Sequence, residues 1–172
     1  LYDEELRSGA LYMDSAPVTD VLLDCKDRLW LATRGEGLVV QGRWSKASAA
    51  DPDALSDNNV YDLHADRAGR VWVATLGGGI NLAEEADGKL KFRHFFAESS
   101  GKRNVRCIEE DSEGRLWVGT NGGIVVFDPD SLVADDEAWT EFSFEKGTLP
   151  GNEIRSIYAD SSGTVWCSVS GV

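Results

Sequence analysis

The sequence predicts an all-β protein built from repeated units of four short antiparallel strands. Three observations lead to this prediction. A ten-residue phrase ending in a tryptophan-centred strand occurs four times. Turn-forming runs rich in glycine, aspartate and asparagine separate the segments. The segments themselves are short and rich in β-branched and aromatic residues. A repeat of this period is typical of solenoids, propellers and arrays.

The repeated phrase is clearest at residues 111–120, which read Asp-Ser-Glu-Gly-Arg-Leu-Trp-Val-Gly-Thr. In every copy the aspartate stands six residues before the tryptophan, and successive tryptophans are 42, 45 and 49 residues apart. The pairs are Asp24 and Trp30, Asp66 and Trp72, Asp111 and Trp117, and Asp160 and Trp166. Aspartate and glycine favour tight turns, so the phrase predicts a turn that opens into a strand.

The first unit is predicted to contain strands at 18–23, 28–33 and 38–41, with a short piece around Trp44. Residues 47–55 have the composition of a helical turn, which Pro52 limits. In this copy Asp27 stands where the other copies have a turn glycine.

The second and third units repeat the four-strand pattern with glycine turns. The second unit is predicted to have strands at 60–64, 70–75, 79–83 and 90–95. The third is predicted to have strands at 105–109, 115–120, 124–128 and 139–144. Pro129 closes the third of these strands, and the acidic segment 128–137 reads as a solvated loop. No convincing helix is predicted.

Four antiparallel strands per unit favour a β-propeller, so each unit is predicted to be one blade. The fourth unit, 154–172, supplies only two strands, whereas residues 1–14 read as a third and fourth strand. The two ends are therefore predicted to be complementary halves of one blade. Residues 1–172 then form a single propeller region or propeller fragment of about four blade-equivalents. A ring closed on itself, two chains joined as eight blades, and a piece of a larger ring all remain open.

The best copy resembles the two-component regulator propeller repeat, Val-x-x-Ile-x-x-Asp-x-x-Gly-x-Leu-Trp-x-Gly-Thr-x-x-Gly-Gly. The residues that carry the resemblance are Val105, Ile108, Asp111, Gly114, Leu116, Trp117, Gly119, Thr120, Gly122 and Gly123. The copy around Trp72 matches nearly as well, while Ser168 and Val169 replace the Gly-Thr pair in the last copy. Streptogramin-lyase-like propellers share the Gly-x-Leu-Trp phrase but usually lack the glycine continuation.

The resemblance implies a bacterial sensor region. In that family, tandem propellers lie outside the inner membrane, in the periplasm, and feed a histidine kinase or a diguanylate cyclase. Known ligands of the family are often oligosaccharides. The resemblance therefore implies a ligand-binding module for signal transduction, with an oligosaccharide or another small ligand as partner.

Composition and motifs argue against several other functions. A formal net charge of −13 disfavours nucleic acid and anionic membranes, and no apolar run approaches the ~20 residues of a membrane span. The three cysteines lack metal spacing, and the Asp-x-x-Gly turns lack the ligand ladder of a calcium loop. His64 and His94 are the only histidines, and neither accompanies a nucleophile motif. We therefore expect no metal, no cofactor and no enzyme activity.

The tryptophans and aspartates of the phrase are expected to be structural, in packing between blades and in turns. Ligand contacts are instead expected on the face where first strands begin and second strands end. The candidate ligand-binding residues there are Arg34, Asn59, Tyr61, Asn104, Arg106, Asn121 and Arg155. Such groups hydrogen-bond hydroxyls and carboxylates well. The alternative for each asparagine is a role in turn geometry alone.

Three functions follow from these expectations. The first is a sensory propeller module that binds a ligand and has no catalytic activity of its own. The second is a structural or oligomerising scaffold, with a homodimer or neighbouring blades completing a larger ring. The third is a lyase-like propeller enzyme, which would need a histidine and a carboxylate clustered at the channel.

Overall fold

A computed structural model describes residues 16–170, which form antiparallel sheets that we number as blades 1 to 4. Blade 1 contains β1 (Val18–Leu23), β2 (Leu29–Thr33), β3 (Gly37–Val40) and β4 (Arg43–Ser45). Blade 2 contains β5 (Val60–Ala65), β6 (Val71–Thr75), β7 (Ile80–Ala86) and β8 (Lys89–Phe95). Blade 3 contains β9 (Val105–Glu110), β10 (Leu116–Thr120), β11 (Gly123–Phe127) and β12 (Thr140–Phe142). Blade 4 contains β13 (Ile154–Ala159) and β14 (Val165–Val169).

These strands confirm the predicted all-β fold of four-stranded antiparallel units. Within each of blades 1 to 3 the strands pair in chain order, and blade 4 shows the first two strands of the same pattern. The short piece expected around Trp44 is strand β4. The strands expected within 1–14 lie outside the described residues, so their pairing with blade 4 stays a prediction.

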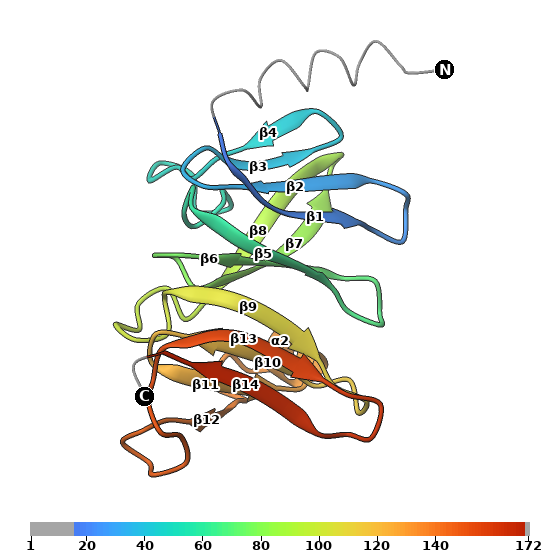
Figure 1. Cartoon of the computed structure of the whole chain (residues 1–172). Coiled ribbons are helices and arrows are strands. Elements are labelled where there is room, and N and C mark those ends of the chain that lie inside the picture. The colour runs from blue at the N-terminus through green and yellow to red at the C-terminus, as the bar shows by residue number, and fades with distance from the viewer. Residues whose placement is uncertain (1–15, 171–172) are drawn as a thin grey trace.

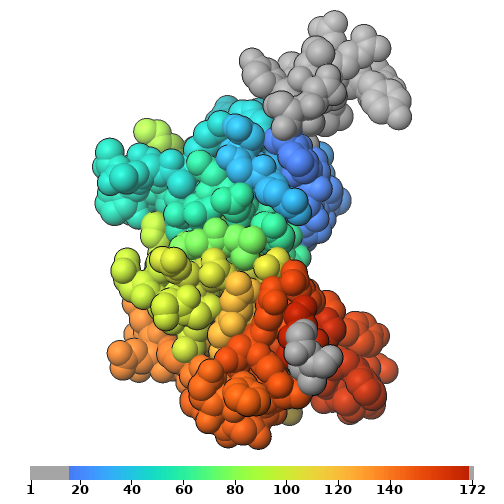
Figure 2. Space-filling view, turned by 60° about the vertical axis from the view of Figure 1, so that its left-hand side comes forward, coloured from blue at the N-terminus to red at the C-terminus, as the bar shows by residue number. Residues whose placement is uncertain are grey.

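The blades stack in sequence order through their first strands, β1 on β5, β5 on β9 and β9 on β13. Figure 1 shows blade 1 at one end of this stack and blade 4 at the other. Figure 2, turned by 60°, shows the same order from blue to red. The described blades therefore form an open stack and do not close into a ring among themselves. No helix within residues 16–170 is long and apolar enough to cross a membrane.

Helix α2 (Pro129–Ala134) is the main departure from the predicted elements. The sequence analysis expected a solvated loop here, and that expectation was wrong. Asp128 is the N-cap, since its side chain accepts a hydrogen bond from the Ser131 backbone N–H at 2.8 Å. Pro129 occupies the first turn, where its missing N–H costs nothing. By contrast, residues 47–55 form turns and a bridge between Ala47 and Leu55.

The core lies between successive blades and is organised around the repeated tryptophans. Trp30 packs in one cluster with Phe92 of blade 2, and the Trp72 ring lies 5.5 Å from the Phe127 ring of blade 3. Both tryptophans are fully buried, Trp117 is half-buried, and Trp166 is 62% exposed. Burial of each tryptophan therefore depends on the blade that follows it.

Candidate functional site

The Asp–Trp turns occupy one end of the blades, on the right in Figure 1, where first strands join second strands. Asp24 Oδ1 accepts hydrogen bonds from the backbone N–H groups of Lys26 and Arg28, both at 2.9 Å. Its Oδ2 accepts from Trp30 Nε1 at 2.8 Å. The other three copies repeat the bond from the tryptophan Nε1 to the aspartate at 2.8–3.0 Å. The hydrogen bonds of these carboxylates are therefore made within the turn and to the tryptophan that follows it.

The electrostatics of these aspartates follow from the same contacts. Burial by itself would raise the pKa of Asp24, but the Arg28 backbone and Trp30 indole hydrogen bonds lower it to about 2. In the exposed last copy, hydrogen bonds from Ser162 and Trp166 lower the pKa of Asp160 to about 2. Carboxylates held ionised in this way are suited to turn stabilisation and poorly suited to acid–base catalysis at neutral pH.

The opposite ends of the first strands carry a β-bulge in every blade. The register of each first strand shifts by one residue against the second strand, which leaves one residue of the first strand without a partner. The bulged residues are Thr19, Tyr61, Arg106 and Arg155. Bulges commonly re-aim side chains next to functional sites. Three of these four residues are among the predicted ligand contacts.

Side chains from four blades meet at this end, and we call the group the arginine rim. Its members are Arg34, Tyr61, Arg106, Asn121, Glu153 and Arg155. The Arg34 and Arg106 guanidinium carbons lie 5.4 and 5.8 Å from the centroid of the Tyr61 ring. Arg106 Nε donates to Asn121 Oδ1 at 3.3 Å. Five of the seven predicted residues therefore lie in one connected group.

Glu153 joins the last two arginines of the rim and was missed by the sequence analysis. Its Oε1 lies 3.3 Å from Arg106 Nη2 and 2.8 Å from Arg155 Nη2. Arg155 Nε also donates to Ser170 Oγ at 2.7 Å. The position directly before a bulged first strand was the available signal, but its ion pair with Arg106 depends on contact between blades 3 and 4.

The other two predicted contacts, Asn59 and Asn104, act through their backbone. The Asn59 carbonyl accepts from the Leu76 N–H at 2.9 Å, and the Asn104 carbonyl accepts from the Asn121 N–H at 3.1 Å. The Asn59 side chain donates to Asp57 Oδ1 at 3.0 Å. The two backbone bonds hold the starts of β5 and β9 against the ends of β6 and β10.

Two further carboxylates join neighbouring blades along the first strands. Asp20 Oδ2 accepts from the Leu63 N–H at 2.9 Å, and Asp62 Oδ2 accepts from the Ile108 N–H at 2.6 Å. Burial raises the pKa of Asp62 to about 7, and the neighbouring Asp20 carboxyl adds to the rise. The sequence analysis missed both residues, because the edge N–H groups that they satisfy belong to the next blade.

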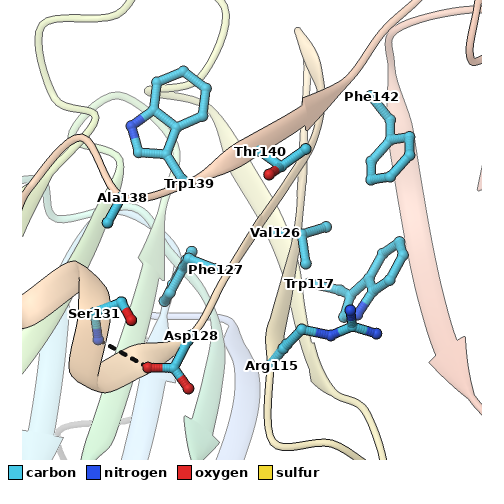
Figure 3. A pocket seen from close by; sticks show the side chains of 10 residues that line it. All are labelled: Arg115, Trp117, Val126, Phe127, Asp128, Ser131, Ala138, Trp139, Thr140 and Phe142. Atoms are coloured by element: carbon cyan, nitrogen blue, oxygen red, sulfur yellow. Dashed lines mark hydrogen bonds between the residues drawn. The ribbon is translucent and has the colours of Figure 1, made fainter.

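A cavity of about 510 Å³ lies on the tryptophan side of blade 3. Figure 3 shows Trp117 with Arg115 and Phe142 on one side of it, and Asp128 bonded to Ser131 on the other. Between earlier blades, third-strand residues of the next blade fill the corresponding space: Phe127 packs on Trp72. The described part of blade 4 has no third strand. We therefore assign this cavity to packing between blades.

The two histidines lie on the first and last strands of blade 2, and His64 faces a carboxylate. His64 Nε2 lies 3.4 Å from Glu110 Oε2, at the inner strands, whereas His94 Nε2 lies 2.7 Å from the Ala54 carbonyl oxygen, at the outermost strand of blade 2. Among residues 16–170 no group of three or more His, Cys, Asp or Glu side chains is placed to hold a metal ion.

The comparisons with known proteins agree with this architecture. Residues 54–77, 99–122 and 148–171 each match the family described as two component regulator propeller. No curated protein matches the chain.

Solved structures show the same fold. An extracellular domain assigned to a hybrid two-component system of B. thetaiotaomicron has a TM-score of 0.74 and 24% identity, over 88% of this chain and 22% of that one. A second such domain from that organism gives 0.67 and 26%, over 89% and 20%. Virginiamycin B lyase from Staphylococcus aureus gives 0.60 and 16%, over 90% and 49%. The chain spans about a fifth of the two extracellular domains.

Proposed function

Because three segments of the chain match the two component regulator propeller family, we propose that it is a sensory propeller module of a bacterial two-component-type receptor. The module binds an oligosaccharide or another small ligand at the arginine rim and has no catalytic activity of its own. The observation that carries this proposal is the convergence of Arg34, Tyr61 and Arg106 from three successive blades. Guanidinium, phenol and amide groups together suit recognition of a hydroxyl-rich ligand.

The location follows from the same proposal. The two neighbours from B. thetaiotaomicron are extracellular domains, which supports the proposal that this module lies outside the inner membrane, in the periplasm. In a receptor of this kind the ligand changes the equilibrium between two arrangements of the propeller and its output module. Three rim residues are bulged residues of first strands that also form the contacts between blades, so a ligand there can bias how blades pack.

Binding to a labelled glycan library tests the proposal. We expect at least one glycan class to bind, and Arg106→Ala and Arg155→Ala each to weaken binding by about tenfold or more, since a charged hydrogen bond is lost. Arg43→Ala is the matched control, because Arg43 is exposed on β4 away from the rim. Absence of binding, or affinity unchanged in both rim variants, would exclude the ligand-binding role.

A scaffold function is the second candidate, and the two ends of the stack favour it. At the blade 4 end Tyr158 and Trp166 are each 62% exposed, and at the blade 1 end Val21 and Leu23 are exposed. The corresponding faces inside the stack are covered by the next blade. We propose that neighbouring blades, or a second copy of the chain, cover these end faces.

A further inference from the structure

The described arginines differ in their partners, and Arg43 and Arg103, both exposed, make no ion pair with another described residue. Away from the rim, ion pairs with one or more carboxylates hold Arg28, Arg67, Arg70, Arg93 and Arg115. At the rim, Arg106 and Arg155 share the single carboxylate of Glu153. Arg34 makes no ion pair or side-chain hydrogen bond with any other described residue. Three guanidinium groups and one carboxylate leave an excess of positive charge in this group.

This excess of positive charge is local, because the chain as a whole is acidic. The formal net charge of the whole chain is −13. Asp57 is a further carboxylate close to the rim, and its Oδ1 accepts from both the backbone and the side chain of Asn59. The surrounding acidic surface repels most anions, so an anion is attracted here only by groups in direct contact with it.

The geometry of the free donors fits a planar or tetrahedral oxyanion. Arg34 lies beside the Tyr61 ring and keeps its guanidinium N–H groups available. The guanidinium of Arg106 uses one nitrogen for Asn121 and one for Glu153, both at 3.3 Å. Guanidinium forks bind carboxylate and sulfate groups through paired hydrogen bonds, and a nearby ring supports stacking of the ligand.

We propose that the arginine rim recognises an anionic group, a carboxylate or a sulfate, on the ligand. This inference rests on the proposed ligand-binding function and narrows its chemical class. Arg34 and Arg106 bind the anionic oxygens, and Tyr61 contacts the body of the ligand. Glu153 holds Arg106 and Arg155 in place and prevents a larger excess of charge.

Isothermal titration with matched oligosaccharides tests the inference. The probes are tetragalacturonate, its fully methyl-esterified form, and galactotetraose with and without sulfate groups. We expect at least one anionic probe to bind about tenfold or more tightly than its neutral counterpart, with affinity that falls as salt is raised. The two anionic probes distinguish carboxylate from sulfate as the recognised group.

Substitutions test whether the arginine rim causes the tighter binding of the anionic probe. Arg34→Ala and Arg106→Ala are expected to weaken the anionic probe by about tenfold or more while Arg43→Ala leaves it unchanged. Arg106→Lys keeps the charge but loses the fork, so it should fall between wild type and Arg106→Ala. Thermal unfolding of each variant shows that the fold is retained.

The outcomes separate this inference from the proposed function. Equal binding of the anionic and neutral probes, or binding of neutral glycans alone, overturns the anion inference but leaves a ligand-binding module. If the anionic and neutral probes and the glycan library all fail to bind, both the inference and the proposed function are overturned.

Discussion

At the scale of single residues, every tryptophan of the repeat makes the same bond to its aspartate, but the neighbouring blade decides what the pair contributes to stability. Trp72 is fully buried against blade 3, whereas Trp166 is 62% exposed. Loss of a buried ring leaves a cavity and removes apolar contacts, and loss of an exposed ring removes few contacts.

This difference predicts unequal effects of the same substitution. Trp72→Ala should lower the free energy of unfolding by about 3–5 kcal/mol, and Trp166→Ala by about 1 kcal/mol or less. Urea unfolding followed by circular dichroism measures both. Equal losses in the two variants would show that the bonds within the turn, and not the following blade, determine how much each tryptophan contributes to the free energy of unfolding.

The carboxyls between blades predict a dependence of stability on pH. The pKa of Asp62 is about 7 in the folded chain, above the value of about 3.9 for an unfolded aspartate. A raised folded pKa stabilises the protein below the unfolded pKa, and this stabilisation is lost as pH rises through the folded pKa. Stability should therefore fall between about pH 4 and pH 7.

Asp62→Asn removes this ionisation and should flatten the decline of the melting temperature over that range. Asp160→Asn is the control. The pKa of Asp160 is lowered to about 2, so its ionisation changes stability only below about pH 4. A decline that persists unchanged in Asp62→Asn would rule out the Asp62 carboxyl as its cause.

At the scale of elements, the turn between second and third strands is the joint between blades. The Thr75 hydroxyl donates to the Gly79 carbonyl at 2.9 Å, and the N–H groups of Gly77 and Gly79 donate to the Arg103 carbonyl of the next blade. Thr33 and Thr120 repeat the hydroxyl bond at 2.6 and 2.8 Å. The threonine that ends the second strand of blade 2 and the glycines of the turn that follows it thus serve one joint.

Two glycines with nearly the same backbone test this joint. Gly79 and Gly88 have φ of +72° and +71°, but a Cβ at Gly79 would collide with the Phe95 carbonyl oxygen, whereas space around Gly88 is open. Gly88→Ala should cost about 1–2 kcal/mol from backbone strain alone. Gly79→Ala should cost at least about 2 kcal/mol more. Denaturant unfolding compares the two, and equal costs would mean that the turn relaxes freely.

The strands and the helix show how much of the fold can be predicted from the sequence. Turn residues and alternation located the strands of blades 1 to 3 and the first two of blade 4, because each is a local signal. Helix α2 was missed because the acidic run around Asp130 outweighed its capping signal, Asp128 followed by Pro129. At the rim, Tyr61, Arg106 and Arg155 were named from the expected ends of the strands, but the bulges were not predicted, and the position of Glu153 depends on a neighbouring blade that local sequence does not encode.

At the scale of the whole molecule, the described blades form an open stack (Figure 1), and each end of it exposes apolar side chains. One end exposes Tyr158 and Trp166, and the other exposes Val21 and Leu23. Inside the stack, surfaces of these two types pack on each other: Trp30 of blade 1, the equivalent of Trp166, packs with Leu63 of blade 2, the equivalent of Val21. The two ends are therefore complementary, which is the requirement for head-to-tail association.

Association through these ends predicts a concentration-dependent mass. Sedimentation of the isolated 18.8 kDa chain should show species of twice this mass or more as concentration rises. Val21→Asp and Trp166→Asp should each shift the equilibrium toward monomer, and Arg43→Ala should not. A monomer at every concentration would show that the end faces do not bind each other.

The central claim of the account is that recognition belongs to the arginine rim and that the Asp–Trp turns at the other end are structural. Hydrogen–deuterium exchange, with and without tetragalacturonate, tests this claim most directly. We predict slower exchange at 34–37, 59–62, 104–107 and 153–156, and no change in the turns at 24–28, 66–70 and 111–115. Protection confined to the Asp–Trp turns, with none at the rim, would contradict the account.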